Sequence, residues 1–447
     1  MTLRLNTLLR PLSSLAFPSR WREPLSFSPH SLAPLVLLSL APWSNCLASD
    51  TIYVVTNKAE GNTVAAFRAD NTAPLSLVAE YATGGLGTGD LEIPALEKNP
   101  QHPLANGDDP LISANALAAA ADGTWLIVVN PGDGTLSLMN REKDGSLQAV
   151  NSEPASDRFP VSVAIHDELI AVASVGNSNQ AGSIALYRHT PEGLAAVDGS
   201  RRDLGARPST IGFSSSGDVV IVNELVSGKI HSFAASPDGL SAEPVATVDS
   251  PRSPQDRFQA IPVGFAVGKG DPGDLILMSE ARFLTPEFGL REDPNRVPQS
   301  PLYSWQTSSV SSYVLDKHGK LTLKTGDALT GEAMEGGEIA NCWVALNAGG
   351  DTLFTANALS SSISRYHVDP DGSVTLEDAT AYKDDGELLF FSDMALNPAG
   401  DSLYQLVGNT GEVLAFDVAE DGSLSLRDRS GGLPTLGTYG LVVLEDG

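Results

Sequence analysis

Short apolar runs separated by turn-forming residues recur along most of this 447-residue chain. In GDVVIVNEL, residues 217–225, a turn leads into an apolar run that ends at the acid Glu224. The same frame ends at Asn130 in GTWLIVVN, at Asn357 in GDTLFTAN and at Glu280 in GDLILMSE, always seven positions after the glycine. Such runs, bounded by glycine, asparagine and aspartate, are typical of buried β-strands. We call the last residue of the frame the marker position.

Each frame belongs to a longer repeat of four strand patterns. Residues 394–428 read MALNPAG, DSLYQLV, EVLAFDV and SLSLRD, joined by turns rich in asparagine, aspartate and glycine. Four short antiparallel strands per repeat are the pattern of a propeller blade. The marker position occurs seven times, at Asn57, Asn130, Ser174, Glu224, Glu280, Asn357 and Val407. The sequence therefore predicts an all-β fold, a seven-bladed β-propeller.

The two ends of the repeat region complement each other. The first frame, TIYVVTN at 51–57, has no strand pattern before it, whereas residues 439–444 form a spare apolar strand at the end. We expect this C-terminal strand to pair with the first blade and to close the ring, which leaves no exposed sheet edge. Residues 49–447 are thus predicted to form a single domain.

Two intervals between marker positions are longer than the others, at 73 and 77 residues against 44 to 56. The extra residues are 84–109 and 282–306. In a propeller blade, the loop that enters the inner strand and the loop between the second and third strands open on the same face. We therefore expect both insertions to stand over one mouth of the central channel.

The first 48 residues differ from the repeats, because they are basic and contain the apolar run LAPLVLLSLAP. This composition predicts a secretory signal cleaved near Ala48, and hence an exported protein, periplasmic or secreted. An organellar transit peptide is the alternative. The apolar run is too short to span a bilayer, so no membrane span is expected.

The net charge limits the possible binding partners, and the cysteine count limits the possible disulfides. The chain carries a formal net charge of −27, which becomes −30 without residues 1–48. Such an acidic surface repels nucleic acid and anionic membranes and favours solubility. Outside the predicted signal only Cys342 remains, so we expect no intramolecular disulfide and a buried thiol.

Charged residues near the predicted mouth are the candidates for catalysis. Glu224 and Glu280 end strands of consecutive blades, and paired carboxylates can act as general acid and base. They can equally be rim residues that accept hydrogen bonds from loops. The loops that enter inner strands carry Arg158, Arg207 and Arg257. Arginine there can bind a carboxylate or a lactone oxygen, or form salt bridges with neighbouring acids.

Ligand contacts are expected from Asn130, Asn223, Asn357, Arg158 and Trp305. The asparagines can orient a ligand, although asparagine is also an ordinary residue at the end of a strand. Trp305 can line an apolar pocket or belong to a small core that holds its own loop. Motifs such as GxSxG, the P-loop, HExxH and paired CxxC do not occur, and the histidines are scattered. We therefore expect no cofactor and no metal.

Three segments carry a family resemblance: IYVVTNKAEGNTVAAF, LPTLGTYGLVV and EIANCWVALNAGGDTLFTANALSSSISRYHVDPDGSVTL. They resemble the lactonase-like seven-bladed propeller family, which includes 6-phosphogluconolactonase and carboxymuconate-lactonizing relatives with YVTN-type repeats. The resemblance covers about residues 51–445. In active members an inner strand typically begins Pro-Arg-His and the next strand ends Asn-Glu-Leu. Here Asn223-Glu224-Leu225 matches, but Pro208-Ser209-Thr210 lacks the arginine and the histidine.

The resemblance implies a hydrolase that opens a lactone or a similar cyclic ester. Glu224 would act as general base on water, Glu280 would assist it, and Arg207 or Arg257 would stabilise the oxyanion. A lactonizing isomerase differs from this only in direction and substrate. The alternative is a non-catalytic binding propeller that recognises a small molecule, a glycan or another exported protein on the face with the insertions.

Overall fold

The computed structural model describes residues 49–70, 73–89, 113–176, 181–225, 227–251, 259–284, 307–332, 336–435 and 437–446. The chain divides into two units, Met1–Cys46 and Leu47–Gly447, and the described residues belong to the second. The predicted signal and most of both insertions lie outside these ranges, so those predictions stay open. Within these ranges, no helix has the length and apolar character that crossing a membrane requires.

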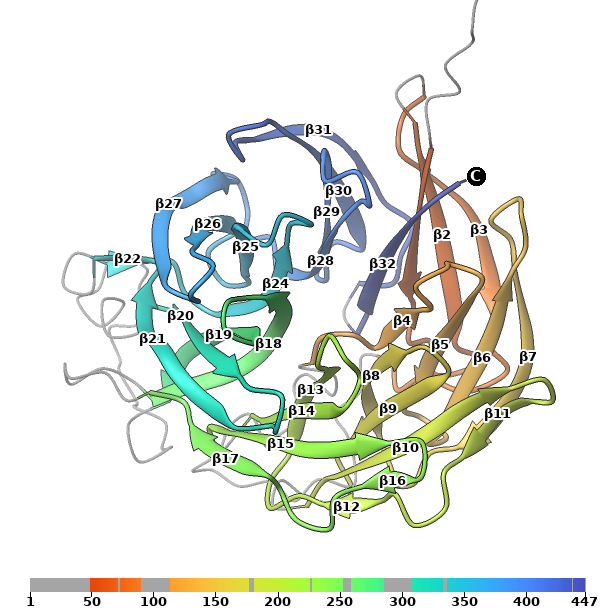
Figure 1. Ribbon diagram of the computed structural model, residues 1–447. Coiled ribbons are helices and arrows are strands. Elements are labelled where there is room, and N and C mark those ends of the chain that lie inside the picture. Colours follow the sequence, from red (N-terminus) through yellow and green to blue (C-terminus); the bar gives the residue numbers. More distant parts are fainter. Residues whose placement is uncertain are drawn as a thin grey trace, which may run out of the picture. The chain divides into compact units, whose positions relative to one another are not determined.

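Seven antiparallel sheets stand around a common centre, as the ring of ribbons in Figure 1 shows, and this confirms the predicted seven-bladed β-propeller. Blade 1 contains β32 (Tyr439–Glu445), β1 (Asp50–Val55), β2 (Thr63–Ala69) and β3 (Ser76–Ala82). Blade 2 contains β4 (Leu117–Ala119), β5 (Trp125–Asn130), β6 (Thr135–Arg141) and β7 (Leu147–Pro154). Blade 3 contains β8 (Pro160–His166), β9 (Leu169–Ser174), β10 (Ser183–Thr190), β11 (Gly193–Ala196) and β12 (Arg202–Asp203).

The remaining blades follow the same order from the inner to the outer strand. Blade 4 contains β13 (Pro208–Phe213), β14 (Val219–Glu224), β15 (Lys229–Ser236), β16 (Gly239–Leu240) and β17 (Ala246–Asp249). Blade 5 contains β18 (Gln259–Lys269), β19 (Asp274–Leu284), β20 (Ser309–Leu315) and β21 (Leu321–Leu329). Blade 6 contains β24 (Asn341–Leu346), β25 (Thr352–Asn357), β26 (Ser362–Val368) and β27 (Val374–Lys383). Blade 7 contains β28 (Phe391–Leu396), β29 (Ser402–Val407), β30 (Glu412–Val418) and β31 (Leu424–Ser430). A separate two-stranded sheet, β22 (Gly331–Glu332) and β23 (Gly336–Gly337), precedes blade 6 in the chain.

The position of a strand within its blade explains its sequence pattern. Second strands such as β5, β14 and β29 are buried at every residue, because both of their faces pack against neighbouring strands or blades. The outer strand β3 instead alternates between exposed and partly buried residues. Continuous apolar runs therefore mark the second strands, and alternation marks the blade edges.

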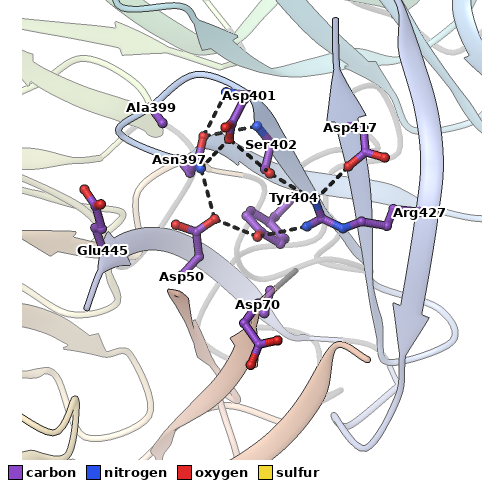
Figure 2. A pocket seen from close by; sticks show the side chains of 11 residues that line it. Asp50, Asp70, Asn397, Ala399, Asp401, Ser402, Tyr404, Asp417, Arg427 and Glu445 are labelled. Carbon is purple, nitrogen blue, oxygen red and sulfur yellow. Dashed lines mark hydrogen bonds and ion pairs between the residues drawn. The ribbon is translucent and has the colours of Figure 1, made fainter. Parts of the chain in front are cut away.

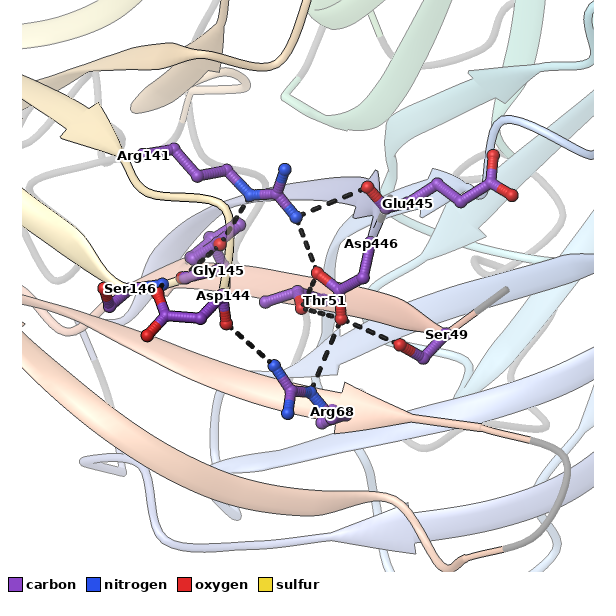
Figure 3. A network of polar contacts seen from close by, with 10 residues as sticks. Ser49, Thr51, Arg68, Arg141, Asp144, Gly145, Ser146, Glu445 and Asp446 are labelled. Atoms are coloured by element: carbon purple, nitrogen blue, oxygen red, sulfur yellow. Dashed lines mark hydrogen bonds and ion pairs between the residues drawn. The ribbon is translucent and has the colours of Figure 1, made fainter. Parts of the chain in front are cut away.

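The ring closes in the predicted manner. β32 pairs with β1 in antiparallel register, with Val442 opposite Tyr53, so the last strand of the chain completes the first blade. In Figure 1 the dark blue β32 lies beside the orange strands of that blade. Beyond the strand, the carboxylate of Asp446 accepts hydrogen bonds from Ser49 and Thr51, both at 2.8 Å, which fastens the two ends together (Figure 3).

We call the end of the ring where inner strands begin the entry face, and the opposite end the hairpin face. On the entry face, the start of the first insertion packs closely on the ends of two strands. A Cβ atom at Gly85 would lie 2.3 Å from Cγ of Asn130, and one at Gly87 would lie 2.2 Å from the backbone of Asn57. The glycine-rich segment GGLGTG is therefore explained by close packing against strand ends.

Candidate functional site

Two of the marker-position asparagines, Asn130 and Asn357, donate to hydroxyls of their own blades. Asn130 Nδ2 donates to the hydroxyl of Ser137 at 2.7 Å, and Asn357 Nδ2 donates to that of Ser364 at 2.8 Å. In both blades a second hydroxyl, two residues earlier in the third strand, accepts from the same amide at 3.1 Å. Both asparagines are fully buried. In this arrangement the amides hold the second strand to the third strand.

Glu224 occupies the same position in blade 4, but its main side-chain partner is a histidine. Nε2 of His231 lies 3.4 Å from Oε1 of Glu224, without the alignment of a hydrogen bond. The backbone N–H of Ala206 donates to the same oxygen at 3.1 Å, and the hydroxyl of Ser227 donates to Oε2. The imidazole is held on its other side by Thr247, with Nδ1 and Oγ1 2.8 Å apart. The result is a carboxylate–imidazole pair that is nearly closed to solvent, since Glu224 is 1% exposed.

These contacts decide the charge of Glu224. Burial by itself acts to raise the pKa of the carboxyl, but the contacts with His231, Ser227 and the Ala206 N–H outweigh it, and the pKa lies below its usual value. Glu224 is therefore ionised at neutral pH although it is buried. A buried, ionised carboxylate against an imidazole can accept a proton or fix the orientation of the ring.

Glu280 has a different environment. Its Oε2 accepts from Ser309 Oγ at 2.7 Å and lies 3.4 Å from Nη2 of Arg282, which also donates to Asp327 Oδ1 at 2.5 Å. No donor in the described part of the chain reaches Oε1. Burial raises the pKa of Glu280, and the neighbouring Arg282 only partly offsets this.

The sequence predicts that Glu224 and Glu280 are neighbours at the channel mouth. The structure places Glu224 at the end of β14, whereas Glu280 lies within β19, which continues to Leu284. Each carboxylate is bonded within its own blade. Among the described residues, no hydrogen bond or ion pair joins the two carboxylates. The two acids at the marker position thus occur with a basic partner, whereas Asn130 and Asn357 each occur with a pair of hydroxyls.

The remaining candidates in blade 4 surround Glu224. Arg207 is buried, and its carbonyl accepts from the N–H of Leu225, next to Glu224. Asn223 Nδ2 donates to the carbonyl of Pro262 at 2.7 Å, which ties blade 4 to blade 5. The catalytic role of Arg207 and the ligand role of Asn223 stay predictions.

The other predicted residues are Arg158, Arg257 and Trp305. Arg158 is exposed on the entry face, with its guanidinium 5.1 Å from the centre of the Phe159 ring. Arg257 and Trp305 fall outside the described residues. Their predicted roles stay open.

A tryptophan occupies the centre of the ring. Trp343, on the inner strand of blade 6, is 1% exposed and stacks on Tyr439 of blade 1, with the ring centres 6.1 Å apart. Its Nε1 donates to the carbonyl of Ser113, in the segment entering blade 2, at 2.9 Å. One side chain therefore connects the inner strands of blades 6 and 1 with the segment that enters blade 2. The thiol of Cys342 beside it is buried, as predicted.

A hollow of about 330 Å³ lies on the hairpin face, between blades 7 and 1 (Figure 2). Asp50 of β1 stands on one side, and Tyr404 of β29 and Arg427 of β31 stand on the other. Tyr404 donates to Oδ2 of Asp50 at 2.8 Å, and Arg427 Nη2 donates to the Tyr404 hydroxyl at 3.2 Å. The sequence patterns gave no sign of this hollow, because its walls come from opposite ends of the chain.

No family model matches the chain, and no curated protein matches it in sequence. The similarity to known proteins lies in the structure. The periplasmic gluconolactonase of Pseudomonas aeruginosa superposes with a TM-score of 0.60 and 16% identity, over 88% of this chain and 99% of that one. A Bacteroides fragilis protein proposed to be a 6-phosphogluconolactonase gives a TM-score of 0.55 and 14% identity, over 90% of this chain and 99% of that one.

A hypothetical selenium-binding protein of Sulfolobus tokodaii has a comparable structural similarity, with a TM-score of 0.58 and 8% identity. The match covers 89% of this chain and 94% of that one. At such identities the likeness concerns the fold alone. The protein is therefore a seven-bladed β-propeller of the shape found in gluconolactonase-type proteins. One fold of this kind carries several functions, so the function has to be argued from the site.

Sequence reasoning did not single out His231 as a partner of Glu224. A usable signal exists in the strand register. The asparagine at the marker position contacts the third residue of the following strand in blades 2 and 6, and His231 is the third residue of β15. Applying that spacing to blade 4 would have placed the imidazole against the carboxylate.

Proposed function

We propose that the protein is an exported hydrolase that opens a lactone or a similar cyclic ester at the entry face of blade 4. The observation that carries this proposal is the pairing of the buried, ionised carboxylate of Glu224 with the imidazole of His231. A carboxylate–imidazole pair beside a loop-bearing face is a recurrent arrangement for activating water.

In the proposed reaction, Glu224 and His231 together accept a proton from water. The resulting hydroxide attacks the lactone carbonyl, and the tetrahedral intermediate collapses with cleavage of the ring C–O bond. The departing alkoxide takes the proton back and becomes the hydroxyl group of the hydroxy acid. For water to reach Oε2 of Glu224, it has to replace the hydroxyl of Ser227. A base positioned in this way contributes roughly 10²–10⁴ in rate.

The local sequence differs from that of active lactonases in an instructive way. Ser209 and Thr210 stand where the resemblance leads us to expect arginine and histidine. Here the imidazole beside the glutamate comes from the third strand of the blade, through His231, and an arginine, Arg207, precedes Pro208. We propose that Arg207 or Arg257 stabilises the oxyanion and that Glu280 has a supporting role.

The structural neighbours support the choice of substrate class and compartment. Two of them carry the names gluconolactonase and 6-phosphogluconolactonase, and one of these is periplasmic. Together with the basic and apolar composition of residues 1–48, this supports export. Sugar lactones are thus the first substrates to test.

The direct test measures hydrolysis of a panel of sugar and aliphatic lactones by base consumption, with wild type and Glu224→Gln. We expect wild type to exceed the buffer rate on at least one lactone and the variant to lose about a hundredfold or more in kcat. Glu338→Gln is the matched control. Glu338 is also a buried carboxylate with a cationic partner, Lys383 Nζ at 3.1 Å, but it lies in the segment that enters blade 6. The control variant should retain the activity of the wild type.

One observation favours the alternative of a non-catalytic binding propeller. Both oxygens of Glu224 already have partners within the blade, and the side chain is 2% exposed. If wild type hydrolyses none of the lactones faster than buffer does, the binding function replaces the catalytic one. The entry face should then be tested for a small molecule, a glycan or a protein partner.

A further inference from the structure

The hollow between blades 7 and 1 is part of a longer groove on the hairpin face. A second hollow of about 380 Å³ shares four lining residues with the first, at Ala69, Asp70, Asp417 and Arg427. It continues outward past Pro74 and Leu75, near the turn between β2 and β3. The volume of the first hollow falls at the lower end of the range for small-molecule sites.

The described residues that line the first hollow are strongly acidic. Five carboxylates face one basic side chain, namely Asp50, Asp70, Asp401, Asp417 and Glu445 against Arg427. The charge of Arg427 is already balanced by an ion pair, because its Nη1 lies 2.7 Å from Asp417 Oδ1. The electrostatic potential in the hollow is therefore negative, which attracts cations and repels anions.

Asp50 lies in this hollow, and one oxygen of its carboxylate accepts two hydrogen bonds. Oδ2 accepts from Tyr404 at 2.8 Å and from Asn397 Nδ2 at 3.0 Å. Both hydrogen bonds of the Asp50 side chain among the described residues are on Oδ2, and Figure 2 draws none on Oδ1. The side chain is 7% exposed, and burial raises the pKa of its carboxyl. Figure 2 shows the carboxylate between Glu445 and the Asn397–Tyr404 side of the hollow.

Neighbouring side chains fix the orientation of Asp50. Arg427 donates to the hydroxyl oxygen of Tyr404, so the Tyr404 hydroxyl hydrogen is directed at Asp50. Asn397 is held in turn by Asp401, which accepts from the same amide at 2.8 Å. A carboxylate held in this way, without a cation in contact with it, is unfavourable until a cation is supplied.

We propose that this hollow is a binding site for a small organic cation, an alkyl diamine or triamine, with one ammonium group on the free oxygen of Asp50. A second ammonium group would lie towards the rim carboxylates Asp401 and Glu445. The methyl groups of Ala69 and Ala399, which also line the hollow, provide apolar contacts for the methylene chain. This site is on the opposite face from Glu224 and is independent of the proposed hydrolase.

The spacing of the carboxylates argues against a metal ion. Calcium requires six to eight oxygen ligands that converge at roughly 2.3–2.6 Å. Here Asp401 is engaged by Asn397 and Asp417 by Arg427, on separate elements. Among the described residues, no cluster of three or more acidic, histidine or cysteine side chains is arranged to hold a metal. A flexible ligand with separated charges fits this distribution better.

The test is isothermal titration calorimetry of the mature protein with putrescine and spermidine. The uncharged analogue 1,4-butanediol and calcium chloride are titrated in parallel. Asp50→Asn removes the negative charge of Asp50 but keeps an acceptor for Tyr404. Asp401→Asn removes one negative charge from the exposed rim of the hollow. The matched control is Asp122→Asn, in a turn of the same face in blade 2, where the carboxylate accepts from Thr124.

We expect saturable binding of an amine at one site per chain and no binding of the diol. Asp50→Asn should weaken amine binding about tenfold or more, Asp401→Asn by a smaller factor, and Asp122→Asn not at all. The proposal is overturned if neither amine binds, if calcium binds and the amines do not, or if all three variants bind like wild type. If Asp50→Asn does not fold, the contrast between Asp401→Asn and Asp122→Asn decides the question.

Discussion

Arg141 and Asp446 form an ion pair across the closure of the ring, with 2.6 Å between Nη2 and Oδ1. Arg141 ends the third strand of blade 2, and Asp446 follows the last strand of the chain. Nε of the same arginine donates to the hydroxyl of Tyr53 at 2.9 Å, and Arg68 lies 3.4 Å from the other oxygen of Asp446 (Figure 3). One carboxylate therefore connects the first and last residues of the propeller with strands of blades 1 and 2.

Asp446→Asn should destabilise the propeller. The variant loses the ion pairs with Arg141 and Arg68. It also loses one of the two carboxylate oxygens that accept hydrogen bonds from the hydroxyls of Ser49 and Thr51. Both partners of the main pair are largely but not wholly buried, at 11% and 15% exposure, so we expect a loss of about 1–3 kcal/mol in the free energy of unfolding. Urea unfolding measures this loss. Asp122→Asn, at an exposed turn without an ion pair, should differ from wild type by less than about 0.5 kcal/mol. Equal midpoints for the two variants would contradict the role of Asp446.

The contribution of Glu224 to the free energy of unfolding should decrease as the pH falls. The pKa of its carboxyl in the folded protein lies below the ordinary value of 4.5, so the folded state favours the ionised form. Its contribution is thus present above pH 4.5 and is lost as the pH falls through the folded-state pKa. We expect wild type to exceed Glu224→Gln by about 1–2 kcal/mol at neutral pH and the difference to shrink on acidification. Thermal unfolding of both proteins between pH 3 and pH 7 measures this, and a difference that grows towards low pH would refute it.

Arg282 should be the most sensitive residue of the Glu280 cluster. It is buried between Glu280 and Asp327, so Arg282→Met leaves two acids without their cation. We expect a loss of about 3–5 kcal/mol. Glu280→Gln should cost less than about 1 kcal/mol, because burial already raises the pKa of Glu280 and favours the neutral form. Guanidinium unfolding curves of both variants check these values, and a larger loss for Glu280→Gln than for Arg282→Met would reverse the assignment.

The repeat made the blades predictable to within a few residues. The predicted third strand of blade 7, EVLAFDV, coincides with β30, because turn residues mark both of its ends. The outer strand of blade 4 departs from the repeat. It is interrupted between β16 and β17, at a segment that contains Pro244, because proline cannot continue a hydrogen-bonded ladder.

The site was less predictable, for a physical reason. The sequence identified Glu224 and Glu280 as unusual, but it did not identify their charge partners. The imidazole of His231 reaches Glu224 from the neighbouring strand through strand register, whereas Arg282 lies two residues after Glu280 on the same strand, β19. The hollow at Asp50 depends on residues about 350 positions apart in the chain, such as Asp50 and Tyr404. Local patterns carry no information on such contacts.

Thr210 shows why the arginine–histidine pair of active lactonases does not fit blade 4 as it stands. Its hydroxyl donates to the carbonyl of Val263 at 2.7 Å and accepts from the N–H of Ala114 at 3.1 Å, and the side chain is fully buried. Thr210→His would lose both bonds and overpack the junction of three blades. We expect it to cost about 3 kcal/mol or more in the free energy of unfolding.

Thr210→Ser is the matched control for this variant. It keeps the hydroxyl bonds and loses one methyl group, so the expected loss is about 1 kcal/mol. Circular dichroism melting of wild type and both variants distinguishes these outcomes. If Thr210→His folds with the stability of wild type, the packing explanation is wrong. The position could then accept the imidazole of the family, and lactone turnover of that variant should be measured next to that of the wild type.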